Sequence, residues 1–262
     1  MTVARGGISF GESWRVLAYT LVLALAFVAL GRAQVALFNA PAVQRLLQGT
    51  GLVDGLSDAK LGEQAAAVAA ASRDALARAP AGHRLATLRL GYELGYVSEH
   101  FGLFALAPEP ARERAWQVLA PQRATADAMA AQLGVAPAAA LRSGSLREFG
   151  ELDARYEADE SGLAARLEQQ LSPWHRHVYL LGVHLGIESA RIEATQGERS
   201  APPAALIRRH AALAGIASAL WQPLSAAPGG TPAEQTQRYR SAVQALAAAL
   251  AQQDAASAPG TR

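Results

Sequence analysis

The chain has 262 residues, of which 51% are hydrophobic and 18% are charged, and this composition excludes an intrinsically disordered chain. Its 24 basic and 22 acidic residues are interleaved and give a formal net charge of +2, so no basic face for nucleic acid is expected. The absence of cysteine excludes disulfides, thiolate metal sites and a lipid-modified cysteine.

The N-terminus carries an uncharged apolar run from Val16 to Gly31. Its length lies between the core of a signal peptide and the roughly 20 residues of a full membrane span. Trp14 and the arginines that flank the run suit the membrane interface. The alanine- and arginine-rich, lysine-poor composition resembles that of a high-GC bacterium. We therefore expect residues 14–31 to anchor the chain in a bacterial inner membrane by a single pass, with the bulk of the chain in the periplasm.

A cleaved signal peptide is the alternative for this segment. Small residues at Gly31 and Ala33 suit a signal peptidase, so cleavage before Gln34 would release a soluble periplasmic protein. The apolar run is long for a signal peptide, which favours the uncleaved anchor. Residues 1–38 thus form the tail and the anchor or signal segment, and a linker is expected over 39–56.

The rest of the chain predicts an all-α fold, a bundle of about seven helices over 57–253 followed by a disordered tail over 254–262. Alanine dominates the apolar residues and is the best helix former, whereas β-branched residues are sparse. Start and stop signals define the helix boundaries. The expected helices cover 57–79, 83–106, 110–133, a segment that begins with the capping box of Ser145 and Glu148, 173–195, 200–221 and 231–253.

Capping residues mark several of these boundaries. Thr231 and Glu234 form a capping box, in which each side chain bonds the backbone N–H of the other residue. Ser172 is expected to cap the helix that starts at Pro173, since proline suits a first turn where its missing N–H costs nothing. Gly134 suits the left-handed residue that follows a helix C-terminus.

An internal duplication links two of the helices. LGYELGYVS at Leu90–Ser98 and LGVHLGIES at Leu181–Ser189 share the pattern L-G-x-x-L-G-x-x-S. The flanking helices agree in order, and such repeats imply shared packing. We predict two three-helix pseudo-repeats, over about 57–134 and 145–221, and a closing helix over 231–253.

The repeated residues recur at i, i+3, i+4 and i+7, which places them on one face of each helix. Glycine inside a helix costs about 1 kcal/mol relative to alanine, so a pair of glycines in each helix needs a physical reason. Close approach of the two helix backbones is the favoured reason, and a groove opened for a ligand is the alternative. The expected helix-packing residues are Gly91, Gly95, Ser98, Gly182, Gly186 and Ser189.

The run LGYELGYVSEHFG, followed by a helix that ends in AAQLGV, resembles a group of uncharacterised, membrane-attached, all-helical proteins of bacterial envelopes. The resemblance covers about residues 85–195 and implies a helical fold and an envelope location, without a settled activity. Those proteins are commonly lipoproteins. This chain lacks the cysteine that a lipoprotein needs, so it departs from the group in its mode of attachment.

Polar side chains form a stripe on each repeated helix. Glu93 and His184 occupy equivalent repeat positions, so packing of the two helices could bring them together. A Glu–His cluster between helices can bind a ligand, hold a metal or relay protons, although surface ion pairs and a hydrogen-bonded interior explain the same residues. The candidate ligand-binding residues are Glu93, Tyr96, His100, His177, His184 and Glu188.

No known motif accompanies these residues. The sequence lacks Glu-x-x-His, H-E-x-x-H, Walker and G-x-S-x-G patterns, so we assign no catalytic residue, metal ligand or cofactor. The favoured function is a non-enzymatic, membrane-anchored module that acts in protein interaction or as an envelope accessory. The alternatives are a periplasmic binding protein that holds a small or lipidic ligand between the Gly-containing helices, and a metal-dependent enzyme with a Glu/His site.

Overall fold

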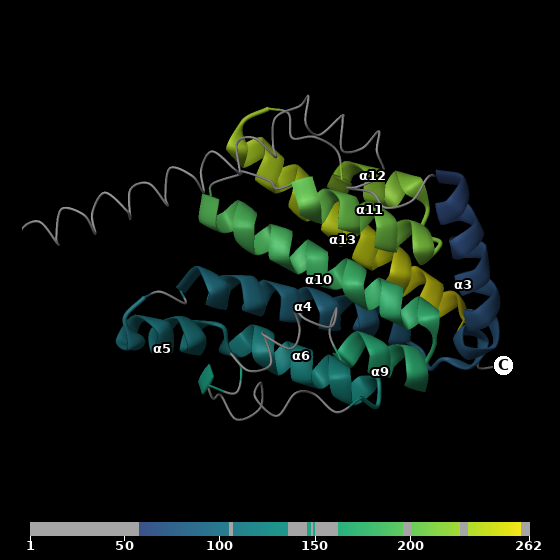
Figure 1. The fold of residues 1–262 in the computed structure, drawn as a ribbon, viewed down its shortest axis with the longest axis horizontal. Coiled ribbons are helices and arrows are strands. Elements are labelled where there is room, and N and C mark those ends of the chain that lie inside the picture. Colours follow the sequence, from purple (N-terminus) through teal and green to yellow (C-terminus); the bar gives the residue numbers. More distant parts are fainter. Residues whose placement is uncertain are drawn as a thin grey trace, which may run out of the picture. The chain divides into compact units, whose positions relative to one another are not determined.

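The regular elements of the part of the chain that the structure describes are α-helices (Figure 1). The computed structural model describes residues 58–104, 107–135, 146–147, 149, 162–195, 201–225 and 230–257. These residues all belong to one compact unit, Asp54–Arg262, and they contain no strand, which confirms the all-α class for this part of the chain.

The N-terminal predictions lie outside the described residues. These are the anchor over 14–31, the cleavage site before Gln34 and the linker over 39–56. The start of the helix expected after Ser145 also falls largely outside them. None of the helices that the structure describes is both long and apolar enough to cross a membrane.

The described part of the chain contains nine helices, against about seven expected from the sequence. They are α3 (Asp58–Arg78), α4 (His83–Phe104), α5 (Glu109–Val118), α6 (Ala120–Gln132), α9 (Gly162–Gln170), α10 (Pro173–Thr195), α11 (Ala201–Leu213), α12 (Ser218–Ser225) and α13 (Pro232–Ser257). The difference arises because two expected helices are interrupted.

The expected helix over 110–133 divides at Leu119 into α5 and α6. Pro121 lies in the first turn of α6. Proline has no N–H to donate and its ring excludes the carbonyl oxygen of the preceding turn, so it is tolerated at a helix start but not within one.

The expected helix over 200–221 also divides, here after Leu213. Gly215 has a φ of 66°, which favours glycine. The N–H of Ile216 donates to the carbonyl oxygen of Ala211 at 3.0 Å, and the N–H of Gly215 donates to that of Ala212 at 2.9 Å. These two bonds form a Schellman motif, which ends α11 and lets α12 begin in a new direction.

The expected caps at Gly134 and at Thr231 are confirmed, whereas Ser172 makes a different contact from the one expected. Gly134 has a φ of 68° at the end of α6. The N–H of Thr231 donates to Glu234 Oε2 at 2.8 Å and the N–H of Glu234 donates to Thr231 Oγ at 3.3 Å. At the start of α10, however, the Ser172 hydroxyl pairs with His175 Nδ1 at 2.8 Å, so an imidazole is its partner.

Helices α4 and α10 lie side by side and run parallel to each other (Figure 1). A Cβ atom on Gly91 would fall on the carbonyl oxygen of Tyr179 and 2.9 Å from Val183 N, and one on Gly186 would fall 2.7 Å from Tyr96 N. Backbone atoms thus occupy the space that a side chain would need. All four glycines of the repeated pattern lie in this contact: Gly91, Gly95, Gly182 and Gly186.

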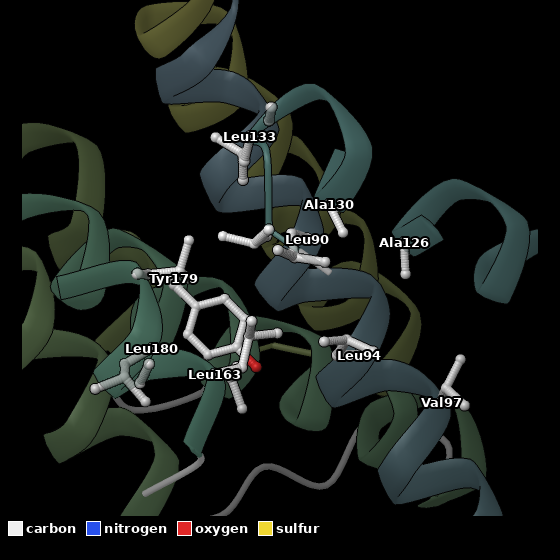
Figure 2. Packing of buried hydrophobic residues seen from close by; sticks show 14 of the residues in the cluster. Leu90, Leu94, Val97, Ala126, Ala130, Leu133, Leu163, Tyr179 and Leu180 are labelled. Carbon is white, nitrogen blue, oxygen red and sulfur yellow. The ribbon is translucent and has the colours of Figure 1, made fainter. Parts of the chain in front are cut away.

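A hydrophobic core lies on each side of the α4–α10 pair. The first packs side chains of α4 and α10 against α5, α6 and α9. Figure 2 shows Leu90 of α4 in this core between Tyr179 of α10 and Ala130 of α6, with Leu94 further along α4. The second core packs α10 against α11, α12 and α13, with α3 at its edge. The pair is therefore the middle layer of the bundle.

Helix α13 continues to Ser257, which corrects the expected boundary at residue 253. Asp254 is only 4% exposed and lies against the start of α4. Its Oδ2 accepts the N–H of Leu85 at 3.0 Å, and its Oδ1 accepts the N–H of Arg84 at 3.2 Å and the Arg84 guanidinium at 3.3 Å. The first N–H groups of a helix have no partner within the helix and attract negative charge. Asp254 therefore caps α4 from the far end of the chain.

Replacing this cap tests its contribution to stability. We expect Asp254→Ala to lower the free energy of unfolding by about 1–3 kcal/mol, because it leaves buried donors of α4 without a partner. Asp74→Ala is the control, since Asp74 is exposed on α3. Urea unfolding followed by circular dichroism measures both variants, and equal stability of the two would contradict the cap.

Candidate functional site

The structure separates the candidate residues of α4 from those of α10. Glu93 follows Gly91 by two positions, and His184 follows Gly182 by two, so each lies about 200° around its helix from the glycine face. Both side chains therefore point away from the helix contact. The expected meeting of Glu93 with His184 is wrong for this reason. Burial is the larger effect and raises the pKa of Glu93, and the nearby Arg89 guanidinium lowers it.

Six polar residues join α4 to α10 beyond the glycines, and we call them the interhelix ladder: Tyr92, Tyr96 and Glu99 of α4, and Ser189, Arg191 and Glu193 of α10. The Tyr92 hydroxyl donates to Ser189 Oγ at 2.9 Å, and the Tyr96 hydroxyl donates to Glu193 Oε2 at 2.7 Å. Two nitrogens of Arg191 donate to the two carboxylate oxygens of Glu99 at 2.7 and 3.2 Å. Three consecutive turns of α4 are thereby linked to a segment of α10 that is little more than one turn long.

The two tyrosines of the ladder remain hydrogen-bond donors at neutral pH. Burial is the main cause that raises the pKa of Tyr92 and of Tyr96, and the carboxylate of Glu193 adds to the effect on both. Arg240 of α13 donates to Glu193 at 3.1 Å, so the closing helix is tied to the ladder. The ring of His100 packs against that of Tyr96 with centroids 4.3 Å apart and planes inclined by 32°.

On the other side of α10, His177 and His184 meet His210 of α11. We call these three residues the imidazole column. His210 is 3% exposed, and its ring centroid lies 5.4 Å from that of His177 and 5.5 Å from that of His184. The ring planes are inclined by 28° and 12°, so the three rings are stacked. His177 and His184 are seven residues apart, which puts them on one face of α10.

The column is held neutral at physiological pH. Burial is the largest cause in each residue, and it lowers the pKa of His177 and His184 to about 4 and that of His210 well below its ordinary value. His177 Nδ1 and His210 Nδ1 are 3.2 Å apart, so one of these nitrogens carries a proton and the other accepts it.

A second pair of histidines lies at the start of the two central helices. His83 Nε2 is 3.2 Å from the carbonyl oxygen of Gln132, and the rings of His83 and His175 meet edge to face at 6.1 Å. Burial is the main cause that lowers the pKa of His175 to about 4. These groups are 7% and 1% exposed, respectively, so they belong to the packed interior.

The geometry offers no support to a metal centre in the part of the chain that the structure describes. No group of three or more histidine and carboxylate side chains there is arranged to hold a metal ion. His177 and His210 direct their Nδ1 atoms at each other. Glu188 is fully buried on α10. At the glycine contact, backbone atoms fill the space that a ligand between α4 and α10 would need.

Sequence reasoning missed His210, Asp254 and most of the ladder as partners of the candidate residues. The ladder has a detectable signal, because Tyr92, Tyr96 and Glu99 follow each other at i, i+4 and i+7 beside the glycine face. His210 and Asp254 are single residues far from α4 and α10 in sequence, and no spacing rule connects them to these helices.

Comparisons of the chain with protein-family models, curated proteins and solved structures give no match. The resemblance to membrane-attached envelope proteins therefore stays a prediction.

A double-mutant cycle tests whether the ladder stabilises the helix pair. We expect Tyr92→Phe and Ser189→Ala each to be destabilising, with a coupling energy of about 0.5–1.5 kcal/mol, because they share one partly buried hydrogen bond. Urea denaturation of the wild type, both single variants and the double variant gives this energy. Tyr92→Phe with Thr236→Ala, whose hydroxyl is engaged only on α13, is the uncoupled control. Additive effects in the first cycle would contradict the ladder.

Proposed function

We propose that this protein is a single-pass inner-membrane protein whose periplasmic helical bundle acts by binding another protein of the cell envelope, without catalysis of its own. The membrane part of the proposal depends on the apolar run over Val16–Gly31 and its flanking arginines. The binding part depends on the bundle.

The observation that carries the proposal is the engagement of the candidate polar groups with one another. A catalytic acid, base or nucleophile must be able to reach a substrate atom. In the ladder, Tyr96 bonds Glu193 and Arg191 bonds Glu99, and in the column His210 lies between two other imidazoles. These contacts favour a structural role for the polar residues that the sequence singled out.

The bundle also has the rigidity that suits an interaction module. Its central helices are in backbone contact, and its last helix caps the start of α4. Preformed surfaces lose little entropy on binding. Leu103 and Val118 are large hydrophobic side chains that are 49% and 75% exposed, and these positions offer places to attach a probe.

Native mass spectrometry of the full-length protein, extracted gently from its own membrane, tests the proposal. We expect an intact N-terminus and a second protein present in a fixed ratio. A photo-crosslinking residue at Val118 should reach the same partner, and one at Asp74 on α3 is the matched exposed control. A chain that begins at Gln34 would contradict the anchor. An anchored chain without a partner mass, and without a discrete crosslink from any exposed position, would contradict the binding role.

A further inference from the structure

The imidazole column lies at the contact through which α11 packs on α10. His210 shares its face of α11 with Ile207 and Ala211, which are both 0% exposed. These residues pack with Leu181 and Leu185 of α10 in the second core. Two imidazoles from α10 enclose the His210 ring within this apolar surrounding. A proton added to His210 would therefore place a charge inside a hydrophobic core, which is strongly unfavourable unless a counter-charge is present.

The charges around the column do not provide that compensation. Arg176 and Arg209 act on both His177 and His210, and Arg191 of α10 acts on His184. The carboxylate that acts on His177 is Glu168 of α9, which is already bound to Arg176 at 2.5 Å. Arg191 is likewise paired with Glu99, so the two ion pairs nearly cancel and Arg209 adds a further positive charge. No net negative charge therefore acts on the column.

The other helices that pack around the column bring little negative charge to it. From α3, Asp58 is paired with Arg208 of α11. Helix α12 contains no ionisable residue. No charged side chain of α4 or α13 is among the groups that act on the three imidazoles. The fully buried Glu188 lies one turn beyond His184 on α10.

We propose that the imidazole column is an acid-sensitive latch, in which proton uptake by His177, His184 and His210 releases α11 from α10, together with α12, which packs on α11, and uncovers the apolar core beneath them. The latch goes beyond the proposed function, because it would make part of the buried surface available only in acid. Neutral rings stack and hold α11 closed. A first proton repels a second at about 5.5 Å, so protons enter together with opening rather than into the closed state.

The direction of the pH dependence follows from linkage. The closed state holds the pKa of His177 and His184 near 4, below the ordinary value of 6.5 that the opened state regains. Between these values the opened state binds more protons than the closed state. The stability of the closed latch is therefore fully present above about pH 6.5 and is lost progressively as the pH falls to about 4.

Hydrogen–deuterium exchange of the full-length protein at pH 7.5 and pH 5, corrected for the intrinsic pH dependence of exchange, tests the latch. Linkage predicts a loss of protection of at least about tenfold at pH 5 for each histidine that gains a proton on opening. We expect this loss in α11 and α12 and not in α6, which packs on the other side of the α4–α10 pair. An equal loss in α6 and α11 would mean global unfolding and would overturn the latch.

The variant His210→Leu removes the central proton acceptor and replaces it with an apolar side chain of similar volume. We expect α11 in this variant to lose about tenfold less protection at pH 5 than in the wild type, because one of the three histidines that gain a proton on opening is absent. His100→Leu is the matched control, since His100 lies on α4 against Tyr96, and it should leave the acid response of α11 unchanged. An unchanged acid response in His210→Leu would overturn the proposal.

Nuclear magnetic resonance of the wild-type imidazoles keeps the proposal testable if His210→Leu fails to fold. We expect the three column histidines to remain neutral at pH 5.5 in molecules whose α11 is still protected. Titration of these histidines near 6.5, with α11 protected throughout, would overturn the latch.

Discussion

The backbone contact between α4 and α10 is the constraint on which the rest of the described structure depends. Because two turns of each helix present glycine, the helices approach until the Cβ positions of one meet the backbone of the other. Only at this separation can Tyr92 reach Ser189 and Arg191 reach Glu99. The same contact fixes the two outer faces of the pair, against which the two hydrophobic cores are assembled.

A parallel pair brings the positive ends of two helix dipoles together, which is unfavourable. The chain also places basic residues there, in the pairs His83–Arg84 and His175–Arg176. Asp254 offsets the positive end of α4 through its backbone donors, and Glu168 pairs with Arg176 at the start of α10. Burial keeps His175 neutral by lowering its pKa to about 4. Thus α13 and α9 contribute the carboxylates that make the parallel arrangement stable.

Local patterns in the sequence predicted the features that local physics controls. The helical class, the bounds of α10, the Gly134 cap and the Thr231 capping box follow from propensity and from hydrogen bonding within a few residues. The division at Gly215 was missed although its glycine signal was present, because the apolar pattern continues into α12. The pseudo-repeat remains a prediction, although its two glycine pairs lie in one contact.

The candidate site was less predictable because its partners are set by tertiary packing. Glu93 and His184 occupy matching positions of the repeated pattern, which suggests that they meet. Matching positions fix how far along each helix a residue lies, but not whether its side chain faces the other helix. His184 turns to His210, a residue that no spacing rule singles out. The sequence around Asp254 predicts a disordered tail, because nothing nearby in the sequence indicates a partner. Its partners are the backbone N–H groups of Arg84 and Leu85, about 170 residues earlier in the chain.

The most direct test of this account is the stability of Gly182→Ala compared with Gly62→Ala, measured by urea unfolding. Both glycines are inside helices, but a Cβ on Gly62 would have nothing within 4 Å, whereas one on Gly182 would fall on the carbonyl oxygen of Leu88 and 2.9 Å from Tyr92 N. We predict that Gly62→Ala stabilises the protein by about 0.5–1 kcal/mol through helix propensity, and that Gly182→Ala destabilises it by at least about 2 kcal/mol. A Gly182→Ala variant as stable as Gly62→Ala would show that α4 and α10 are not in backbone contact.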